Sequence, residues 1–187
     1  IRDAHVDATR RCDRLDLDLI ELNAAHGYLL HEFLSPLTNL REDNYGGSSD
    51  NRMRYPLEIF EQMRAVWPEG KPMGVRLSVT DWLDGGWELE QATEFCRQLR
   101  SRGCDYIAVS TGGLSLDQKI TLEEGYQVPF AKAIREETGI PTMAVGMIYR
   151  PEHADSIIAE ENADFVAIAR GMLFHPHWPW RAAAALN

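Results

Sequence analysis

The chain has 187 residues, of which 44% are hydrophobic and 26% are charged, a balance typical of a soluble globular protein. Its 19 basic and 29 acidic side chains give a net charge of −10, which argues against nucleic acids and anionic membrane surfaces as partners. The sequence has no apolar run long enough to cross a membrane and no signal-peptide pattern, so we expect a cytoplasmic protein without membrane association.

Along the chain, the apolar pattern predicts one helix followed by five strand–helix units. The predicted strands are short and almost continuously apolar, as is typical of strands covered on both faces: Leu17–Asn23, Met73–Thr80, Tyr106–Ser110, Thr142–Ile148 and Phe165–Ala169. The predicted helices carry apolar residues at helical spacing: Asp3–Leu15, Asn51–Trp67, Leu89–Arg102, Val128–Thr138, Pro151–Glu161 and Trp178–Leu186. Strict alternation predicts a parallel sheet in an α/β fold.

Two α/β architectures fit this order of elements. One is a doubly wound sheet, although no GxGxxG turn follows the first strand as it does in dinucleotide-binding sheets. The other is a (β/α)8 TIM barrel, and because a whole barrel needs eight strands and about 250 residues, five strands predict only part of one. The connection from His31 to Asp50 is long for either architecture, so we expect it to be functional or to contain a short element.

Side chains that donate hydrogen bonds cluster after the first predicted strand, at Asn23, His26 and Tyr28. The sequence from residue 26 onward reads HGYLLHEFLSPLTN, then R-x-D-x-YGGS and NR, and it resembles the old yellow enzyme family of flavin-dependent ene-reductases. Further motifs agree in order along the chain: GVRLS, STGG, GYQVPFA, AVGMI and AIARGML. The resemblance covers essentially the whole chain and is closest to the bacterial branch that includes xenobiotic reductases.

The resemblance implies an eight-stranded barrel that binds FMN, in which this chain is similar to strands four to eight. Residues 1–187 would then form the C-terminal portion of a single FMN-binding barrel domain, with the first three strands in a longer protein. The implied activity is an oxidoreductase that takes electrons from NAD(P)H and reduces the activated C=C bond of an enone or related substrate. We expect the isolated chain to be inactive, and a homo-oligomer stays open.

The resemblance assigns the chemistry to the three residues after the first strand. Asn23 and His26 match the pair that hydrogen-bonds the substrate carbonyl oxygen, and Tyr28 matches the residue that protonates the α-carbon. The family usually has His at the first position of the pair, so Asn23 departs from the pattern. Both side chains still donate hydrogen bonds.

Flavin binding is implied at the ends of the later strands. Arg76 lies inside an apolar strand, where an unpaired charge is expensive, and it matches the residue beside the pyrimidine edge of the flavin. Gly146 and Arg170 suit a phosphate, because glycine lets backbone N–H groups come close and arginine offers a bidentate fork. The expected cofactor-binding residues are Arg76, Gly112, Val145, Gly146, Ala169 and Arg170.

Two other interpretations stay open. Asn23 in place of His keeps a CoA-ester reductase, an iron–sulfur-containing reductase or the reductase half of a fused monooxygenase as alternatives. A truncated barrel with a purely structural or assembly role is the other.

No metal site is expected, because Cys12, Cys96 and Cys104 lack metal-ligand spacing. Four histidines are weak candidates for chemistry: His31, His153, His175 and His177. We expect His153 on a solvated helix face and residues 175–177 in the turn between the last strand and the last helix.

Overall fold

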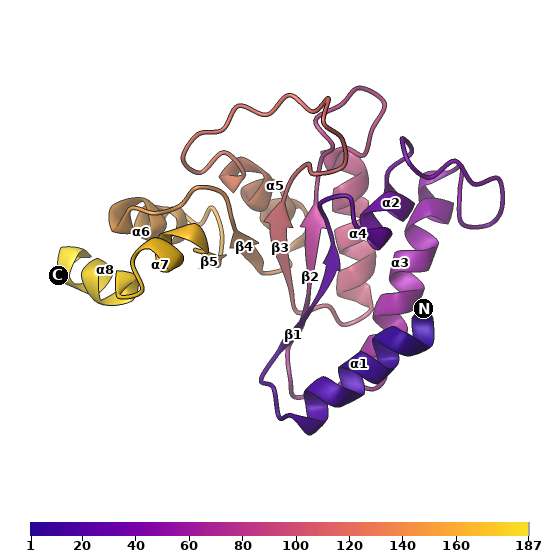
Figure 1. Ribbon diagram of the computed structural model, residues 1–187, viewed down its shortest axis with the longest axis horizontal. Coiled ribbons are helices and arrows are strands. Elements are labelled where there is room, and N and C mark those ends of the chain that lie inside the picture. Colours follow the sequence, from indigo (N-terminus) through magenta and orange to yellow (C-terminus); the bar gives the residue numbers. More distant parts are fainter. Residues whose placement is uncertain (187) are drawn as a thin grey trace.

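The five predicted strands form one parallel sheet in the computed structural model, which describes residues 1–186 (Figure 1). The strands are β1 (Ile20–Ala24), β2 (Met73–Ser78), β3 (Tyr106–Ser110), β4 (Thr142–Ala144) and β5 (Phe165–Val166). They pair in chain order, and the register places Asn23 of β1 beside Arg76 of β2 and Arg76 beside Ala108 of β3. The prediction of a parallel α/β sheet is confirmed.

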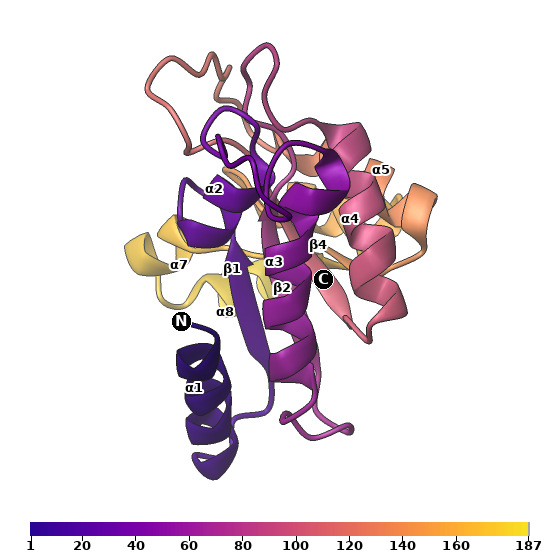
Figure 2. The ribbon, with the colours of Figure 1, turned by 90° about the vertical axis from the view of Figure 1, so that its right-hand side faces the viewer.

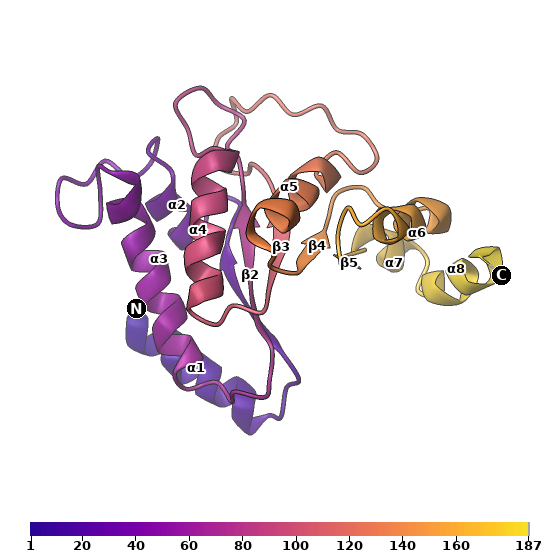
Figure 3. The ribbon, with the colours of Figure 1, turned by 180° about the vertical axis from the view of Figure 1, so that it is seen from behind.

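Helices connect these strands, and Figure 3 shows α3, α4 and α5 side by side across one face of the sheet. The helices are α1 (Arg2–Arg14), α2 (Leu29–Leu34), α3 (Ser49–Arg64), α4 (Leu89–Ser101), α5 (Val128–Thr138), α6 (Pro151–Ala159), α7 (Arg170–Phe174) and α8 (Trp178–Leu186). None of these helices, within residues 1–186, is long and apolar enough to cross a membrane.

Local sequence explains where the main helices begin and end. The Ser48 hydroxyl accepts the Asn51 N–H at 3.3 Å and caps the start of α3. Pro151 occupies the first turn of α6, where its missing N–H costs no helical hydrogen bond. Gly139 has a φ of +64° and ends α5 in the left-handed conformation that glycine adopts freely.

The strand order decides between the two predicted architectures. A doubly wound sheet reverses its strand order at one point and carries helices on both faces. Here the order never reverses, so right-handed crossovers place successive helices on the same face. The fold is therefore part of a (β/α)8 barrel, and the five strands form an open sector of it.

The two faces of the sheet differ in burial. Side chains on the helix-facing side form the core, whose largest fully buried members are Trp87, Phe60, Phe95, Leu30, Leu34 and Met53. On the other face, Glu21 and Asn23 of β1 are exposed and Phe165 of β5 keeps 50% of its surface. In a closed barrel this face is the interior, so these side chains lie where barrel-filling residues belong.

Four strands are shorter than the sequence pattern predicts: β1 starts only at Ile20, β2 ends at Ser78, and β4 and β5 end three or more residues early. In β4 and β5 the chain turns toward the site earlier than predicted. After β4 the backbone leaves the extended conformation at Gly146 (φ +125°) and Met147 (φ +53°). After β5 the chain enters α7 at Arg170, a helix that the pattern did not predict. Residues 175–177 consequently join α7 to α8 and do not follow a strand directly.

The long connection after β1 contains a short helix, as expected, namely α2. Figure 2 shows that the loops after β1, β2 and β3 lie together above the carboxyl ends of the strands. Parallel α/β folds carry their functional sites at the carboxyl ends of the strands, so we expect the site of this protein there.

Candidate active site

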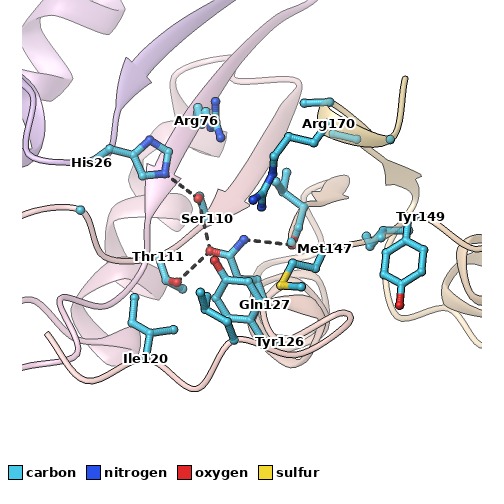
Figure 4. A pocket seen from close by; sticks show the side chains of 18 of the residues that line it. His26, Arg76, Ser110, Thr111, Ile120, Tyr126, Gln127, Met147, Tyr149 and Arg170 are labelled. Atoms are coloured by element: carbon cyan, nitrogen blue, oxygen red, sulfur yellow. Dashed lines mark hydrogen bonds between the residues drawn. The ribbon is translucent and has the colours of Figure 1, made fainter. Parts of the chain in front are cut away.

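A cavity of about 700 Å³ opens at the carboxyl ends of the strands. Six of the nine predicted site residues line it: His26, Arg76, Val145, Gly146, Ala169 and Arg170. They come from β2 and from the ends of β1, β4 and β5, and Figure 4 shows His26, Arg76 and Arg170 around one space. Residues far apart in sequence thus share one pocket, as the barrel fold requires.

Arg76 lies on the open face of β2 and extends into this cavity. Its Nε is buried, and this atom has no hydrogen-bond partner among residues 1–186. Within the same residues, its guanidinium also makes no ion pair. A buried N–H of a charged group that lacks a partner costs about 1–3 kcal/mol or more, unless a ligand compensates it. The residue therefore fits a ligand that presents acceptors to Arg76.

Arg170 stands at the other end of the cavity, at the start of α7. Its side chain is solvent-exposed, and within the described chain it forms no ion pair. The neighbouring Gly146 and Met147 have left-handed backbone conformations, and their N–H groups find no acceptor within the described residues. Successive free N–H groups beside an arginine make a favourable place for an anion such as a phosphate.

His26 lies in the loop after β1, beside Arg76 and across the cavity from Arg170. Its backbone has a φ of +57°, and its N–H donates to Ser78 Oγ at 3.1 Å. Ser78 in turn donates to the Gly112 carbonyl at 2.9 Å. Burial, reinforced by the positive charge of Arg76, lowers the pKa of His26 to about 4, so its imidazole is neutral at pH 7.

A line of hydrogen bonds crosses the floor of the cavity (Figure 4). His26 Nε2 lies 2.7 Å from Ser110 Oγ, and Ser110 Oγ lies 3.3 Å from Gln127 Oε1. Gln127 also accepts from Thr111 Oγ1 at 2.7 Å and donates to the Val145 carbonyl at 3.0 Å. Sequence reasoning missed Ser110, Thr111 and Gln127 as site residues, although Gln127 stands within the GYQVPFA motif.

Three predicted site residues lie outside the cavity wall. Asn23 is exposed on the open face of β1 beside Arg76 in the register. Tyr28 precedes α2 and keeps 65% of its surface exposed. Gly112 lies behind the wall, where its N–H donates to the Thr80 carbonyl at 2.8 Å. Their proposed roles stay predictions.

A buried polar cluster supports the loop that carries His26. The His31 and Asp81 side chains are completely buried, with His31 Nε2 at 2.8 Å from Asp81 Oδ1. The Gly27 N–H donates to His31 Nδ1 at 3.0 Å, so Nδ1 is the bare nitrogen and Nε2–H donates to Asp81. Ser35 Oγ and the Trp87 N–H donate to the other carboxylate oxygen at 2.6 and 2.7 Å. His31 thus orders the loop without contacting the cavity.

The prediction for His153 is wrong. Its side chain is only 21% exposed, and its Nδ1 lies 3.0 Å from Glu124 Oε1, because the loop before α5 folds over the helix that carries it. Arg150 pairs with the same carboxylate at 2.8 Å.

Within residues 1–186, no group of three or more His, Cys, Asp or Glu side chains is placed to hold a metal ion.

Comparison with known proteins decides the family. The model described as the NADH:flavin oxidoreductase / NADH oxidase family matches residues 1–187. The chain belongs to this family. The predicted membership in the old yellow enzyme group of flavoproteins is confirmed, with FMN and NAD(P)H as the family's cofactors.

Individual relatives agree with the family match. The chain is 41% identical over 184 residues to an NADPH dehydrogenase of Geobacillus thermodenitrificans, covering 98% of this chain and 53% of that protein. Among solved structures, a 2-naphthoyl-CoA reductase complex is similar with a TM-score of 0.91 and 26% identity, over 98% of this chain and 29% of the other. A morphinone reductase in complex with tetrahydroNAD gives a TM-score of 0.79 and 28% identity, over 100% and 49%. The chain therefore spans about half the length of the curated relative.

Proposed function

We propose that the protein containing this chain is an FMN-dependent NAD(P)H oxidoreductase that reduces the activated C=C bond of α,β-unsaturated carbonyl compounds. One observation carries the proposal: the cavity of a chain with a net charge of −10 holds two arginines without ion-pair partners in the described residues, one with a buried free Nε. An FMN molecule has an anionic phosphate at one end and a ring with hydrogen-bond acceptors at the other. The two arginines match those two ends.

The residues present fit FMN in the following way. Arg170, with the free N–H groups of Gly146 and Met147, would hold the phosphate. Arg76 would face the pyrimidine edge of the ring and stabilise negative charge there. When bound, FMN supplies the hydride chemistry that no side chain of the protein can provide.

The remaining residues act on the substrate. The neutral imidazole of His26 and the amide of Asn23 would donate hydrogen bonds to the carbonyl oxygen, which makes the β-carbon of the enone electrophilic. Tyr28 would deliver a proton from its hydroxyl to the α-carbon. Each role is a proposal that rests on the family resemblance and, for His26, on its position in the cavity lining.

Flavin retention tests the central assignment. We expect Arg76→Met and Arg170→Ala in the full-length protein to weaken FMN binding about 10- to 150-fold each, the loss that corresponds to roughly 1.5–3 kcal/mol for a charged hydrogen bond. Arg97→Ala is the matched control, because Arg97 is a surface arginine paired with Glu137 at 3.0 Å. Equal FMN affinity in all three variants, measured by fluorescence titration of the apoprotein, would contradict the proposal.

A CoA-ester reductase is a second candidate. The higher TM-score with the 2-naphthoyl-CoA reductase complex, 0.91 against 0.79 for morphinone reductase, favours it, while the identity to NADPH dehydrogenases favours the enone reductase. Anaerobic NADPH oxidation with 2-cyclohexenone and with 2-naphthoyl-CoA distinguishes the two. We expect turnover of the enone, and turnover of the CoA ester alone would overturn that expectation.

A further inference from the structure

The neutral imidazole of His26 can adopt either of two tautomers, and its surroundings determine which one is populated. A neutral imidazole carries one proton, so one ring nitrogen donates and the other accepts. Nε2 lies 2.7 Å from Ser110 Oγ, whereas Nδ1 has no hydrogen-bond partner among residues 1–186. The direction of the Ser110 hydrogen bond therefore determines whether His26 offers a proton or a lone pair to a ligand.

Ser110 has a single hydroxyl proton and two acceptors within reach. The Gln127 amide is oriented by its donation to the Val145 carbonyl, which only accepts, so Gln127 Oε1 is an acceptor. This oxygen already accepts the Thr111 hydroxyl at 2.7 Å. Ser110 Oγ stands farther from it, at 3.3 Å, outside the range of about 2.5–3.0 Å that O–H···O bonds prefer. The Ser110 hydroxyl therefore donates preferentially to His26 Nε2, which lies 2.7 Å away.

We propose that Ser110 is a positioning residue that donates to Nε2 of His26 and thereby holds the ring in the tautomer with the proton on Nδ1. The proposal deepens the proposed function, on which it rests for the use made of that proton, a hydrogen bond to the substrate carbonyl oxygen. In the opposite tautomer Nδ1 would carry only a lone pair and could not donate to a carbonyl oxygen. Ser110 thus supplies a condition for carbonyl binding without contributing to the reacting atoms.

The surroundings of His26 favour a fixed ring. Its backbone N–H is held by Ser78, and an added Cβ at Gly113 would come within 2.6 Å of the His26 Cα, so the two loops are in close contact. The lowered pKa, about 4, keeps the imidazole neutral near pH 7, which is the condition under which a tautomer exists. Arg76, whose positive charge contributes to the lowered pKa, carries only donors and therefore cannot accept the Nδ1 proton.

Nitrogen NMR measures the tautomer directly, without reference to turnover. In the full-length flavoprotein labelled with ¹⁵N-histidine, two-bond ¹H–¹⁵N spectra at pH 7 report which ring nitrogen carries the proton, and His26→Gln assigns the signal. We expect His26 as the Nδ1–H form in the parent and in Ser110→Thr, which keeps the hydroxyl. In Ser110→Ala we expect the Nε2–H form to become dominant.

The matched control is Thr111→Val, which removes the other hydroxyl on Gln127 Oε1 without touching His26. We expect the parent tautomer in this variant. An Nε2–H form in the parent would overturn the inference, as would an unchanged tautomer in Ser110→Ala or an equal change in Thr111→Val.

A ligand titration separates this inference from the proposed function. The probe is 4-chlorophenol, because its oxygen accepts hydrogen bonds as a carbonyl oxygen does, and its binding is followed by the flavin absorbance. We expect Ser110→Ala to weaken it about 2- to 12-fold, the equivalent of roughly 0.5–1.5 kcal/mol for one hydrogen bond. A changed tautomer with unchanged phenol affinity would uphold the role of Ser110 and contradict the assignment of the carbonyl site to His26.

Discussion

At the scale of single residues, the cavity combines two unpaired arginines with a neutral histidine. Arg76 was predictable from sequence, because a guanidinium inside an apolar strand needs a partner, and Arg170 followed from the resemblance. The hydrogen-bonded line through Ser110 and Gln127 was not predictable in the same way. It depends on how closely β3 and the start of α5 approach each other, which no local pattern encodes.

Tyr28 provides a residue-scale test, since it is the proposed acid but lies outside the cavity lining and keeps 65% of its surface exposed. Reduction of the flavin by NADPH requires only hydride from the nucleotide, whereas reduction of an enone requires a proton. We therefore expect Tyr28→Phe to leave flavin reduction near the parent rate and to slow the enone half-reaction about 10²- to 10⁴-fold. Stopped-flow absorbance measures both steps.

Each alternative outcome for Tyr28 has a distinct meaning. Equal slowing of both half-reactions would indicate a packing role. An unchanged enone step would mean that water or another side chain supplies the proton, in keeping with the exposed position of the phenol.

At the scale of elements, α2 and the loop after β2 are joined by the His31–Asp81 pair.

The existence and order of the strands and long helices followed from apolar periodicity. The short helices α2 and α7 did not, because five or six residues carry too little periodicity to distinguish a helical turn from a loop. The sequence also did not indicate the early ends of β4 and β5, because Val145 and Ala167 continue the apolar pattern although they lie beyond the strands and line the cavity.

The Asp81 carboxylate gives the element-scale prediction. Burial raises its pKa, but the hydrogen bonds from His31, Ser35 and the Trp87 N–H outweigh burial and hold the pKa below its ordinary value of 3.8. A group whose pKa is lower in the folded state stabilises the fold above its unfolded pKa and loses that contribution as the pH falls through the folded pKa. An asparagine at position 81 would place its NH2 group against one of the donors that now bind the carboxylate, namely His31, Ser35 or the Trp87 N–H.

We therefore expect Asp81→Asn to lower the free energy of unfolding by about 1.5–3 kcal/mol at pH 7, with a difference from the parent that shrinks below about pH 4. Urea unfolding followed by tryptophan fluorescence at both pH values checks this. The exposed neighbour Asp84 supplies the control Asp84→Asn, for which we expect a change within about 0.5 kcal/mol. A deficit that stays constant into acid would show that the charge of Asp81 is not the source of the stability.

At the scale of the whole molecule, the sheet is an open sector with one strand edge at β1 and another at β5. The open face exposes Glu21 and Asn23, and the resemblance predicts that three further strands cover it in a longer protein. Dependence of activity on those strands remains a prediction. The cavity at the carboxyl ends of the strands, by contrast, is bordered by all five strands of this chain, β1 to β5.

The exposed apolar side chains on α7 and α8 predict that the 187-residue chain, expressed by itself, self-associates. Leu173, Phe174 and Trp180 keep 83%, 93% and 73% of their surface exposed and lie close together in sequence. Clustered apolar surface drives association, and burying one such side chain contributes about 1.5–3 kcal/mol. We expect the chain to self-associate at micromolar concentration and the double variant Leu173→Lys/Phe174→Lys to weaken association more than about tenfold, as measured by light scattering after size exclusion. Leu116→Lys is the matched control, because Leu116 is fully exposed on the loop after β3, away from both helices. If that variant dissociates as readily as the double variant, added positive charge and not the helix surface controls association.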